Sequence, residues 1–248
     1  MLKIIQVGHN DASDRYIRNK IKAVEEAGMK AEVVNLEEDC TTPDVIRAIT
    51  DQVVDIRTKA IIVQLPLPKH IDTDFVCMSI PRWLDIDGLH PHSDYRPLTP
   101  CAIMRWLKEQ NIDLYGKNVA ILGRSELVGK PLANMMIEAG ATVTVMNSKT
   151  QEWMRRTTCQ NADIIVSAVG KVDAVDLQHI YFSRPNVIVI DVGINRDANG
   201  KLCGDVSKDA RRYLGENGGV VTPVPGGVGR WTVKELVLRL KEMEAVEL

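Results

Sequence analysis

Lys117-Asn-Val-Ala-Ile-Leu-Gly123-Arg124-Ser125-Glu-Leu-Val-Gly129-Lys-Pro131 is the segment that decides the fold of this chain. Its apolar run, 119–122, breaks into a loop whose two glycines, Gly123 and Gly129, are six residues apart. An amphipathic helical pattern follows and ends at Gly140. A buried strand, a tight turn and a helix N-terminus together place backbone N–H groups against a phosphate. The segment therefore predicts a dinucleotide-binding unit.

The same loop indicates which dinucleotide is bound. It departs from the pattern G-x-G-x-x-G because Ser125 occupies the position of the second glycine. The next predicted strand, 142–146, is followed by Asn-Ser-Lys at 147–149, where an NAD-binding unit usually has an acidic residue for the ribose 2′-hydroxyl. Arg124 and Ser148 suit a 2′-phosphate instead. We therefore predict NADP rather than NAD as the cofactor.

The composition limits the classes of protein to which this chain can belong. The 248 residues carry a formal charge of −2 with acids and bases interspersed, which gives no electrostatic case for nucleic acid or a membrane surface as partner. The five cysteines are scattered and form no C-x-x-C motif, so we expect reduced thiols and a cytoplasmic location rather than disulfides or a metal site. The N-terminal residues read as a strand rather than a signal peptide, and no apolar run is long enough to span a bilayer.

Strand and helix patterns alternate along the chain, which predicts an α/β fold with parallel sheets. The predicted strands are 2–7, 31–36, 60–65, 119–122, 142–146, 164–168, 187–191 and 220–222. The predicted helices are 13–28 with Ser13 as N-cap, 42–53 with Thr42 as N-cap, 72–80, 99–110, 132–140 and 232–245.

An irregular segment separates two runs of this alternation. Residues 81–100 are rich in proline and histidine, and they lose the periodicity. We therefore expect two lobes with a cleft between them. The first is an N-terminal α/β substrate lobe over 1–113, with the C-terminal helix 232–248 packing back on it. The second, over 114–231, is a Rossmann-type parallel-sheet NADP lobe.

Polar side chains at predicted strand ends are the candidates for chemistry. Tyr16 and Lys20 share a face of the first predicted helix. A solvated lysine is the commoner arrangement, whereas a lysine buried in a cleft can act as an acid/base group. Gln64 lies in an apolar strand end, where an amide is unfavourable unless it is hydrogen-bonded. Asp87, in Asp85-Ile-Asp87-Gly88, either forms an Asx turn or binds the N–H groups of a heterocycle.

Glycine and proline mark three further loops. The segment 222–229, Thr-Pro-Val-Pro-Gly-Gly-Val-Gly, is either a plain hinge or a place of close approach to a ligand. Segments 167–170 and 191–195 also follow strands and contain glycine, as expected where backbone lies against a nicotinamide. His90 and His92 have no further metal ligands nearby and read as loop residues.

Taken together, these segments resemble one family closely, the bifunctional methylenetetrahydrofolate dehydrogenase/methenyltetrahydrofolate cyclohydrolases. The matching motifs occur in the family's order and cover nearly the whole chain. They are Ser13-x-x-Tyr16-x-x-x-Lys20, Val63-Gln-Leu-Pro-Leu-Pro68, Asp85-x-Asp87-Gly88, Gly123-Arg-Ser-x-x-Val-Gly129-x-Pro131, Asp191-Val-Gly-Ile-Asn195 and Thr222-Pro-Val-Pro-Gly-Gly-Val-Gly229.

The resemblance implies two activities in one-carbon metabolism and purine biosynthesis. A hydride passes from 5,10-methylenetetrahydrofolate to NADP, and water then converts the methenyl product to 10-formyltetrahydrofolate. The partners implied are tetrahydrofolate derivatives and a second copy of the chain in a homodimer. Nucleic acid, membrane and metal are not implied.

The resemblance also assigns roles to residues. Lys20 is the acid/base group, Gln64 holds it, Tyr16 packs on the pterin side, and Asp87 binds the pterin ring. Further substrate-binding residues implied are Pro225, Gly226 and Gly227. The cofactor-binding residues implied are Gly123, Arg124, Ser125, Gly129, Ser148, Ile194 and Thr232.

Three departures from the family pattern leave alternatives open. Family members usually have a helix before their first strand. The family's G-V-G-P-M-T corresponds here to Gly227-Val-Gly-Arg230-Trp231-Thr232. Asn147 stands where the family usually has a histidine, directly before Ser148. The alternatives are a folate dehydrogenase that is monofunctional or prefers NAD, a non-catalytic dinucleotide- or folate-binding homologue, and an NADP dehydrogenase of the shikimate type.

Overall fold

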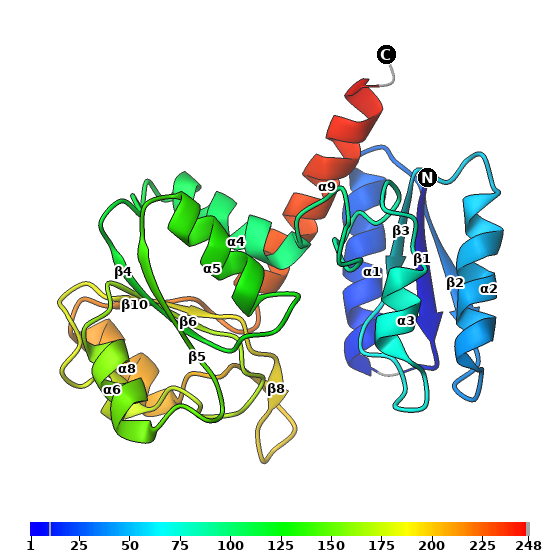
Figure 1. Ribbon diagram of the computed structural model, residues 1–248. Helices are drawn as coiled ribbons and strands as arrows, with labels where there is room; N and C mark the ends of the chain where they lie inside the picture. The colour runs from blue at the N-terminus through cyan, green and yellow to red at the C-terminus, as the bar shows by residue number, and fades with distance from the viewer. Residues whose placement is uncertain (10, 247–248) are drawn as a thin grey trace. The chain divides into compact units, whose positions relative to one another are not determined.

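The computed structural model describes residues 1–9 and 11–246, and its chain forms two compact units (Figure 1). The first unit comprises Met1–Leu98 and Val233–Leu248, and the second comprises Thr99–Thr232. The chain enters the second unit at the start of helix α4 (Leu98–Glu109) and leaves it within helix α9 (Val228–Val246).

A three-stranded parallel sheet forms the centre of the first unit, in the order β2-β1-β3. Its strands are β1 (Leu2–Val7), β2 (Ala31–Leu36) and β3 (Ala60–Val63), and its other helices are α1 (Asp11–Glu26), α2 (Thr42–Val53) and α3 (Thr73–Met78). Helix α2 begins with a capping box between Thr41 and Asp44, one residue before the N-cap that the sequence predicted.

Alternate residues of β1 separate the two cores of this unit. Ile4 packs with Ile17 of α1 and with α9, whereas Ile5 packs with Val45 of α2 and with the segment that contains α3. The sheet is therefore covered on both faces, and polar groups have room only at the ends of its strands.

The second unit is built on a five-stranded parallel sheet in the order β10-β7-β6-β4-β5. Its strands are β4 (Asn118–Leu122), β5 (Thr142–Met146), β6 (Ile164–Ser167), β7 (Ile188–Asp191) and β10 (Val220–Val221). The remaining helices are α5 (Gly129–Glu138), α6 (Glu152–Gln160), α7 (Leu177–Ile180) and α8 (Lys208–Glu216). The strand order reverses between β4 and β6, and in such sheets ligands bind at the carboxyl ends beside that switch point.

Both faces of this sheet are also covered. Helices α4 and α5 pack on the face that carries Val119 and Ile121, and α6, α7 and α8 pack on the face that carries Ala120 and Leu122. Helix α4 belongs to the second unit because its Ile103 and Leu107 are buried in this core, a placement that differs from the expected boundary at residue 113.

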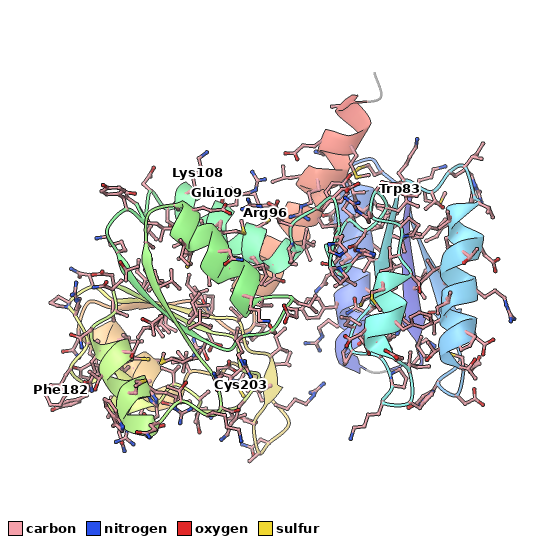
Figure 2. The ribbon with its side chains drawn as sticks, viewed as in Figure 1. Trp83, Arg96, Lys108, Glu109, Phe182 and Cys203 are labelled. Carbon is pink, nitrogen blue, oxygen red and sulfur yellow. The ribbon has the colours of Figure 1, made fainter. Side chains whose placement is uncertain are left out.

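The predicted α/β architecture with two parallel sheets is confirmed, but several elements were not predicted from the sequence. Strands β8 (Asn195–Arg196) and β9 (Leu202–Cys203) form an antiparallel hairpin, where Cys203 is labelled in Figure 2. Helix α9 begins at Val228, so that the end of the glycine-rich segment is helical rather than a hinge. Among the helices of the described residues, none combines the length and apolar character needed to cross a bilayer.

Candidate active site

Lys20 is the centre of a polar group in the first unit. Helix α1 places its side chain in a buried position, with 5% of the residue exposed. Its Nζ donates a hydrogen bond of 3.2 Å to Oε1 of Gln64 and lies 3.8 Å from Oδ2 of Asp87. A buried ammonium is tolerated only where such partners replace its water shell. The structure thus brings together three of the residues that the sequence singled out.

The orientation of Gln64 is fixed at both ends. Its backbone N–H donates to the carbonyl of Ile5 at 2.8 Å, which holds the residue at the carboxyl end of β3 beside β1. Its side-chain Nε2 donates to the carbonyl of Leu65 at 2.7 Å. Since the amide nitrogen is engaged there, the oxygen faces Lys20 and acts as its acceptor.

Asp87 is presented by a loop that its neighbour Asp85 organises. The carboxylate of Asp85 is fully buried and accepts hydrogen bonds from the backbone N–H groups of Leu89, at 3.1 Å, and His90, at 2.7 Å. Burial raises the pKa of Asp85 above its usual value. Asp85 is therefore the structural member of the pair, and Asp87 is the half-exposed carboxylate that faces Lys20.

Tyr16 lies one turn before Lys20 on α1 and is half-buried. Burial raises the pKa of its phenol, so this hydroxyl stays protonated at neutral pH. In the described part of the chain it has no hydrogen bond to Lys20, Gln64 or Asp87. Tyr16 is placed beside the polar group by helical spacing alone.

The loop after β4 in the second unit requires glycine at two positions. Gly123 has φ = +112°, and a Cβ there would overlap the carbonyl oxygen of Ala168. A Cβ at Gly129 would overlap the carbonyl oxygen of Gly123. The loop therefore folds back on itself and leaves backbone, rather than side chains, in front of α5.

Ser125 caps helix α5 from within this loop. Its Oγ accepts hydrogen bonds from the N–H groups of Val128, at 3.2 Å, and Gly129, at 3.4 Å. Because the hydroxyl oxygen accepts these bonds, the hydroxyl can still donate its proton to a ligand. The residue in place of the second glycine of G-x-G-x-x-G thus adds an O–H donor at a helix N-terminus.

Arg124 and Ser148 emerge from adjacent strands. Leu122 at the end of β4 pairs with Met146 at the end of β5, and the N–H of Gly123 donates to the carbonyl of Met146 at 2.9 Å. The two loops therefore leave the same edge of the sheet side by side, and both side chains are exposed. Their location suits the recognition of one anionic group.

Asn147, which precedes Ser148, is used to shape its own turn. Its Oδ1 accepts a hydrogen bond from the backbone N–H of Lys149 at 2.8 Å. The side-chain NH₂ remains as the donor that this position can offer to a ligand.

Two buried carboxylates, to which the sequence assigned no role, organise the other strand ends of this unit. The carboxylate of Asp205 is fully buried and accepts hydrogen bonds from Ser167 Oγ, the N–H groups of residues 169–171 and Asn195 Nδ2, at 2.9–3.2 Å. Its backbone N–H donates to Asp191 Oδ1 at 2.8 Å. Asp205 therefore fixes the loops after β6 and β7 together.

Asp191 continues this network toward the last strand of the sheet. Its carboxylate accepts hydrogen bonds from the N–H groups of Gly193 and Val206 and is paired with the guanidinium of Arg211. Its backbone N–H donates to Thr222 Oγ1 at 2.9 Å. Burial raises the pKa of Asp191, while these donors act in the opposite direction. A sequence signal did exist, since Asp191 ends an apolar strand two residues before Gly193.

The remaining predicted residues surround these loops. Ile194 is exposed after β7, and Pro225 and Gly226 are exposed before α9. Gly227 is buried, and a Cβ there would meet the carbonyl oxygen of Pro223 at 2.5 Å. The loop before α9 thus also has a position, Gly227, without room for a side chain.

Thr232 and the divergent Arg230-Trp231 pair lie on α9. The Thr232 hydroxyl donates to the carbonyl of Val228 within the helix, at 3.0 Å. The Trp231 ring stacks on Trp106, with centroids 4.4 Å apart, and packs on the core of the second unit. Arg230 is exposed. Trp231 is therefore explained by packing, and Arg230 is the exposed member of the pair.

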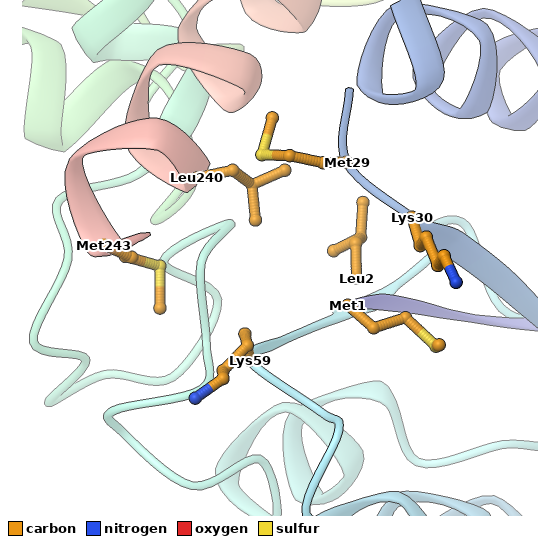
Figure 3. A pocket seen from close by; sticks show the side chains of 7 residues that line it. All are labelled: Met1, Leu2, Met29, Lys30, Lys59, Leu240 and Met243. Carbon is orange, nitrogen blue, oxygen red and sulfur yellow. The ribbon is translucent and has the colours of Figure 1, made fainter. Parts of the chain in front are cut away.

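The pocket drawn in Figure 3 is not a candidate for folate or nucleotide binding. It lies in the first unit at the start of β1, is lined mainly by methionine and leucine side chains, and has a volume of about 20 Å³. This space holds about one water molecule. It also lies at the opposite end of β1 from Gln64, whose N–H pairs with Ile5.

Family models match both parts of the chain. The catalytic domain of tetrahydrofolate dehydrogenase/cyclohydrolase matches residues 1–87, and the NAD(P)-binding domain of the same enzyme matches residues 97–247. A curated relative, the bifunctional protein FolD of Nitrosomonas europaea, is 42% identical over 255 aligned positions, which cover 99% of this chain and 83% of the relative.

Solved structures agree with these matches. The bifunctional enzyme FolD from Campylobacter jejuni superposes with a TM-score of 0.89 at 37% identity and covers 100% of this chain and 88% of its own. The Trypanosoma brucei dehydrogenase-cyclohydrolase, solved with NADP and an inhibitor, has a TM-score of 0.89 at 31% identity and covers 100% of this chain and 88% of its own.

Proposed function

Because this chain belongs to the tetrahydrofolate dehydrogenase/cyclohydrolase family, we propose that it oxidises 5,10-methylenetetrahydrofolate with NADP and hydrolyses the methenyl product to 10-formyltetrahydrofolate. The observation that carries this proposal is the buried group of Lys20, Gln64 and Asp87 in the first unit. A purely structural role does not account for a buried lysine whose partners are an amide oxygen and a half-exposed carboxylate.

The dehydrogenase step depends on binding and alignment. When bound, NADP supplies the hydride acceptor. The glycine loop after β4 fits its phosphates, because Gly123 and Gly129 leave the backbone free of side chains and Ser125 offers a hydroxyl proton. Arg124 and Ser148 bind the 2′-phosphate. The loops that Asp205 holds, 167–171 and 191–195, bind the nicotinamide half.

The cyclohydrolase step needs proton transfers. Water adds to the methenyl carbon and releases one proton to solvent. The Lys20 ammonium then protonates the nitrogen as the carbon–nitrogen bond breaks, and the resulting Lys20 amine takes the proton of the added hydroxyl as the formyl carbonyl forms. Gln64 Oε1 accepts a hydrogen bond from one N–H of Lys20 and thereby directs the other N–H bonds of Lys20.

Asp87 and Tyr16 bind the pterin. Asp87 accepts hydrogen bonds from the N–H groups of the pterin, because its carboxylate is half-exposed and held by a rigid loop. Tyr16 supplies an aromatic face one turn before Lys20. We also assign substrate binding to Pro225, Gly226 and Gly227, as the family resemblance implies.

The assignment of domains, assembly and location completes this proposal. We assign folate binding to the first unit and NADP binding to the second. A homodimer is supported by β5, which lies at the edge of its sheet with Val145 exposed. A cytoplasmic location is supported by cysteines that are scattered along the sequence and form no C-x-x-C motif.

The test is to assay both activities with one variant and its control. The wild-type chain is expected to reduce NADP with methylenetetrahydrofolate and to consume methenyltetrahydrofolate, followed by its absorbance. Lys20→Met is expected to lower the cyclohydrolase kcat by about 10²- to 10⁴-fold. Lys22→Met, which removes an exposed lysine from the same helix, is the control and keeps the wild-type rate. An unchanged rate in Lys20→Met would refute the role of this lysine.

A further inference from the structure

Arg239 of helix α9 is a buried cation that the proposed function does not use. Only 7% of the residue is exposed, although it lies on a helix with an exposed face. Its Nε lies 3.5 Å from Oε1 of Glu235, one turn earlier, and its guanidinium carbon lies 6.0 Å from the centre of the Tyr95 ring. A buried guanidinium with such partners is held in one position.

The remaining contact of Arg239 reaches the loop that carries Asp87. Its Nη1 donates a hydrogen bond of 2.9 Å to the carbonyl oxygen of Ile86. That carbonyl belongs to the peptide group that links Ile86 to Asp87. Because a peptide group is planar, fixing this oxygen also fixes the backbone nitrogen of Asp87 and limits where its side chain points.

The next peptide group is restrained as well. The carbonyl oxygen of Asp87 accepts a hydrogen bond from the N–H of Leu98 at 3.1 Å. Gly88 follows with φ = +71°, where a Cβ would meet the backbone nitrogen of Pro97 at 2.7 Å. Asp87 is thus held between two anchored peptide groups, and Arg239 is the anchor that comes from outside the loop.

We propose that Arg239 is a positioning residue for Asp87, so that the C-terminal helix sets where this carboxylate meets Lys20 and the pterin. The inference rests on the proposed role of Asp87 in folate binding. Displacement of a binding group by about 1 Å is enough to weaken productive binding strongly. Arg239 itself need not touch the substrate.

The test compares Arg239→Met, which removes the donor, with Arg239→Lys, which keeps the charge and an N–H donor on a side chain one bond shorter. Arg239→Met is expected to raise KM for methylenetetrahydrofolate at least tenfold and to leave KM for NADP within twofold of the wild type. Arg239→Lys is expected to stay within about threefold for both. Lys241→Met, an exposed cation on the same helix, is the matched control.

A double-mutant cycle with Asp87→Asn separates positioning from a general loss of structure. If Arg239 acts through Asp87, Arg239→Met adds less than twofold to the loss of kcat/KM that Asp87→Asn causes alone. KM is the chosen readout because it does not depend on the amount of folded enzyme. If Arg239→Met does not fold, Arg239→Gln replaces it, since the glutamine side chain is too short to reach Ile86.

Three results would overturn the proposal. They are an unchanged folate KM in the folded variants, an equal rise in KM for folate and NADP, or a full effect of Arg239→Met in the Asp87→Asn background. A wild-type chain without folate turnover would refute the proposed function instead, so the two failures are distinguishable.

Discussion

Lys20, Gln64 and Asp87 in the first unit meet through their side chains, whereas the strand ends of the second unit present mainly backbone. In the first unit a single polar side chain can be exchanged without moving the sheet behind it. In the second unit the loop positions are fixed by glycines without room for a Cβ and by buried carboxylates such as Asp205. The difference suits a proton-transfer site in the first unit and a nucleotide-binding site in the second.

This comparison predicts which property of the protein a substitution in each unit changes. Changes at the polar group of the first unit are expected to alter chemistry and to leave NADP binding unchanged. Changes in the second unit are expected to alter stability and NADP binding together, because the same backbone does both. The following predictions test that separation.

Gly129→Ala is expected to have the largest effect on the second unit. The new methyl group overlaps the carbonyl oxygen of Gly123, so the start of α5 has to move. We expect a loss of stability of about 3 kcal/mol and a loss of NADP affinity of at least about 100-fold. Thermal unfolding and a fluorescence titration with NADPH measure both.

The matched control for that variant is Gly215→Ala. Gly215 lies inside α8, and a Cβ there has open space around it, so we expect a gain of about 0.5 kcal/mol and no change in NADP affinity. Wild-type NADP affinity in Gly129→Ala would show that the loop is less tightly built than described.

Asp205→Asn tests the carboxylate that joins the loops after β6 and β7. The amide keeps one oxygen and turns an NH₂ group toward donors such as the N–H of Val169 and of Lys171. We expect a loss of about 2–4 kcal/mol in urea unfolding. Asp209→Asn, at an exposed surface pair with Arg212, is the control and is expected to change stability by less than about 0.5 kcal/mol.

Arg124→Ala tests the choice of cofactor. Arg124 is exposed, so its removal leaves the fold intact, and the loss falls on the 2′-phosphate. The ratio of kcat/KM for NADP to that for NAD is expected to fall by about 10- to 100-fold. Arg212→Ala, an exposed arginine on α8, is expected to keep the wild-type ratio. An unchanged ratio in Arg124→Ala would assign the 2′-phosphate to other residues.

The smallest expected effect concerns two buried thiols, one in each unit. Burial raises the pKa of Cys77 to about 11 and that of Cys159 to about 12, whereas the pKa of an unfolded thiol is about 8.5. Below that value the thiols are neutral in both states. As pH rises above it the unfolded state loses protons first, so stability falls, by about 1.4 kcal/mol per thiol between pH 7 and pH 9.5.

Urea unfolding at those two pH values checks this prediction. Cys159→Ala is expected to lose less stability than the wild type over the same interval, even though it is less stable at pH 7. An equal alkaline loss in both proteins would assign the effect to other groups.

The sequence predicted the sheets well because their strands are short apolar runs, as in β1, β3 and β4. It failed where the apolar signal is weak. Helix α8 buries only Ala210 and Leu214 among mostly polar residues, and α7 has four residues, so neither shows a long apolar stripe. The start of α9 was missed because a glycine-rich sequence reads as a hinge until its packing is known.

The candidate site could also be predicted from the sequence only in part. Helical spacing placed Tyr16 and Lys20 on one face, but only the fold brings Lys20 within hydrogen-bonding distance of Gln64, 44 residues away. Asp205 and Arg239 were not found, because the donors and acceptors that define them are distant in sequence. The catalytic and binding roles of these residues remain predictions.

The most direct test of the separation between the two units is the rate of methenyltetrahydrofolate hydrolysis without nucleotide, measured for Lys20→Met and Arg124→Ala. Hydrolysis needs the polar group of the first unit and no hydride acceptor. We predict a loss of at least about 100-fold in Lys20→Met and a rate within about twofold of the wild type in Arg124→Ala. A wild-type rate in Lys20→Met, or an equal loss in both variants, would contradict this description of the molecule.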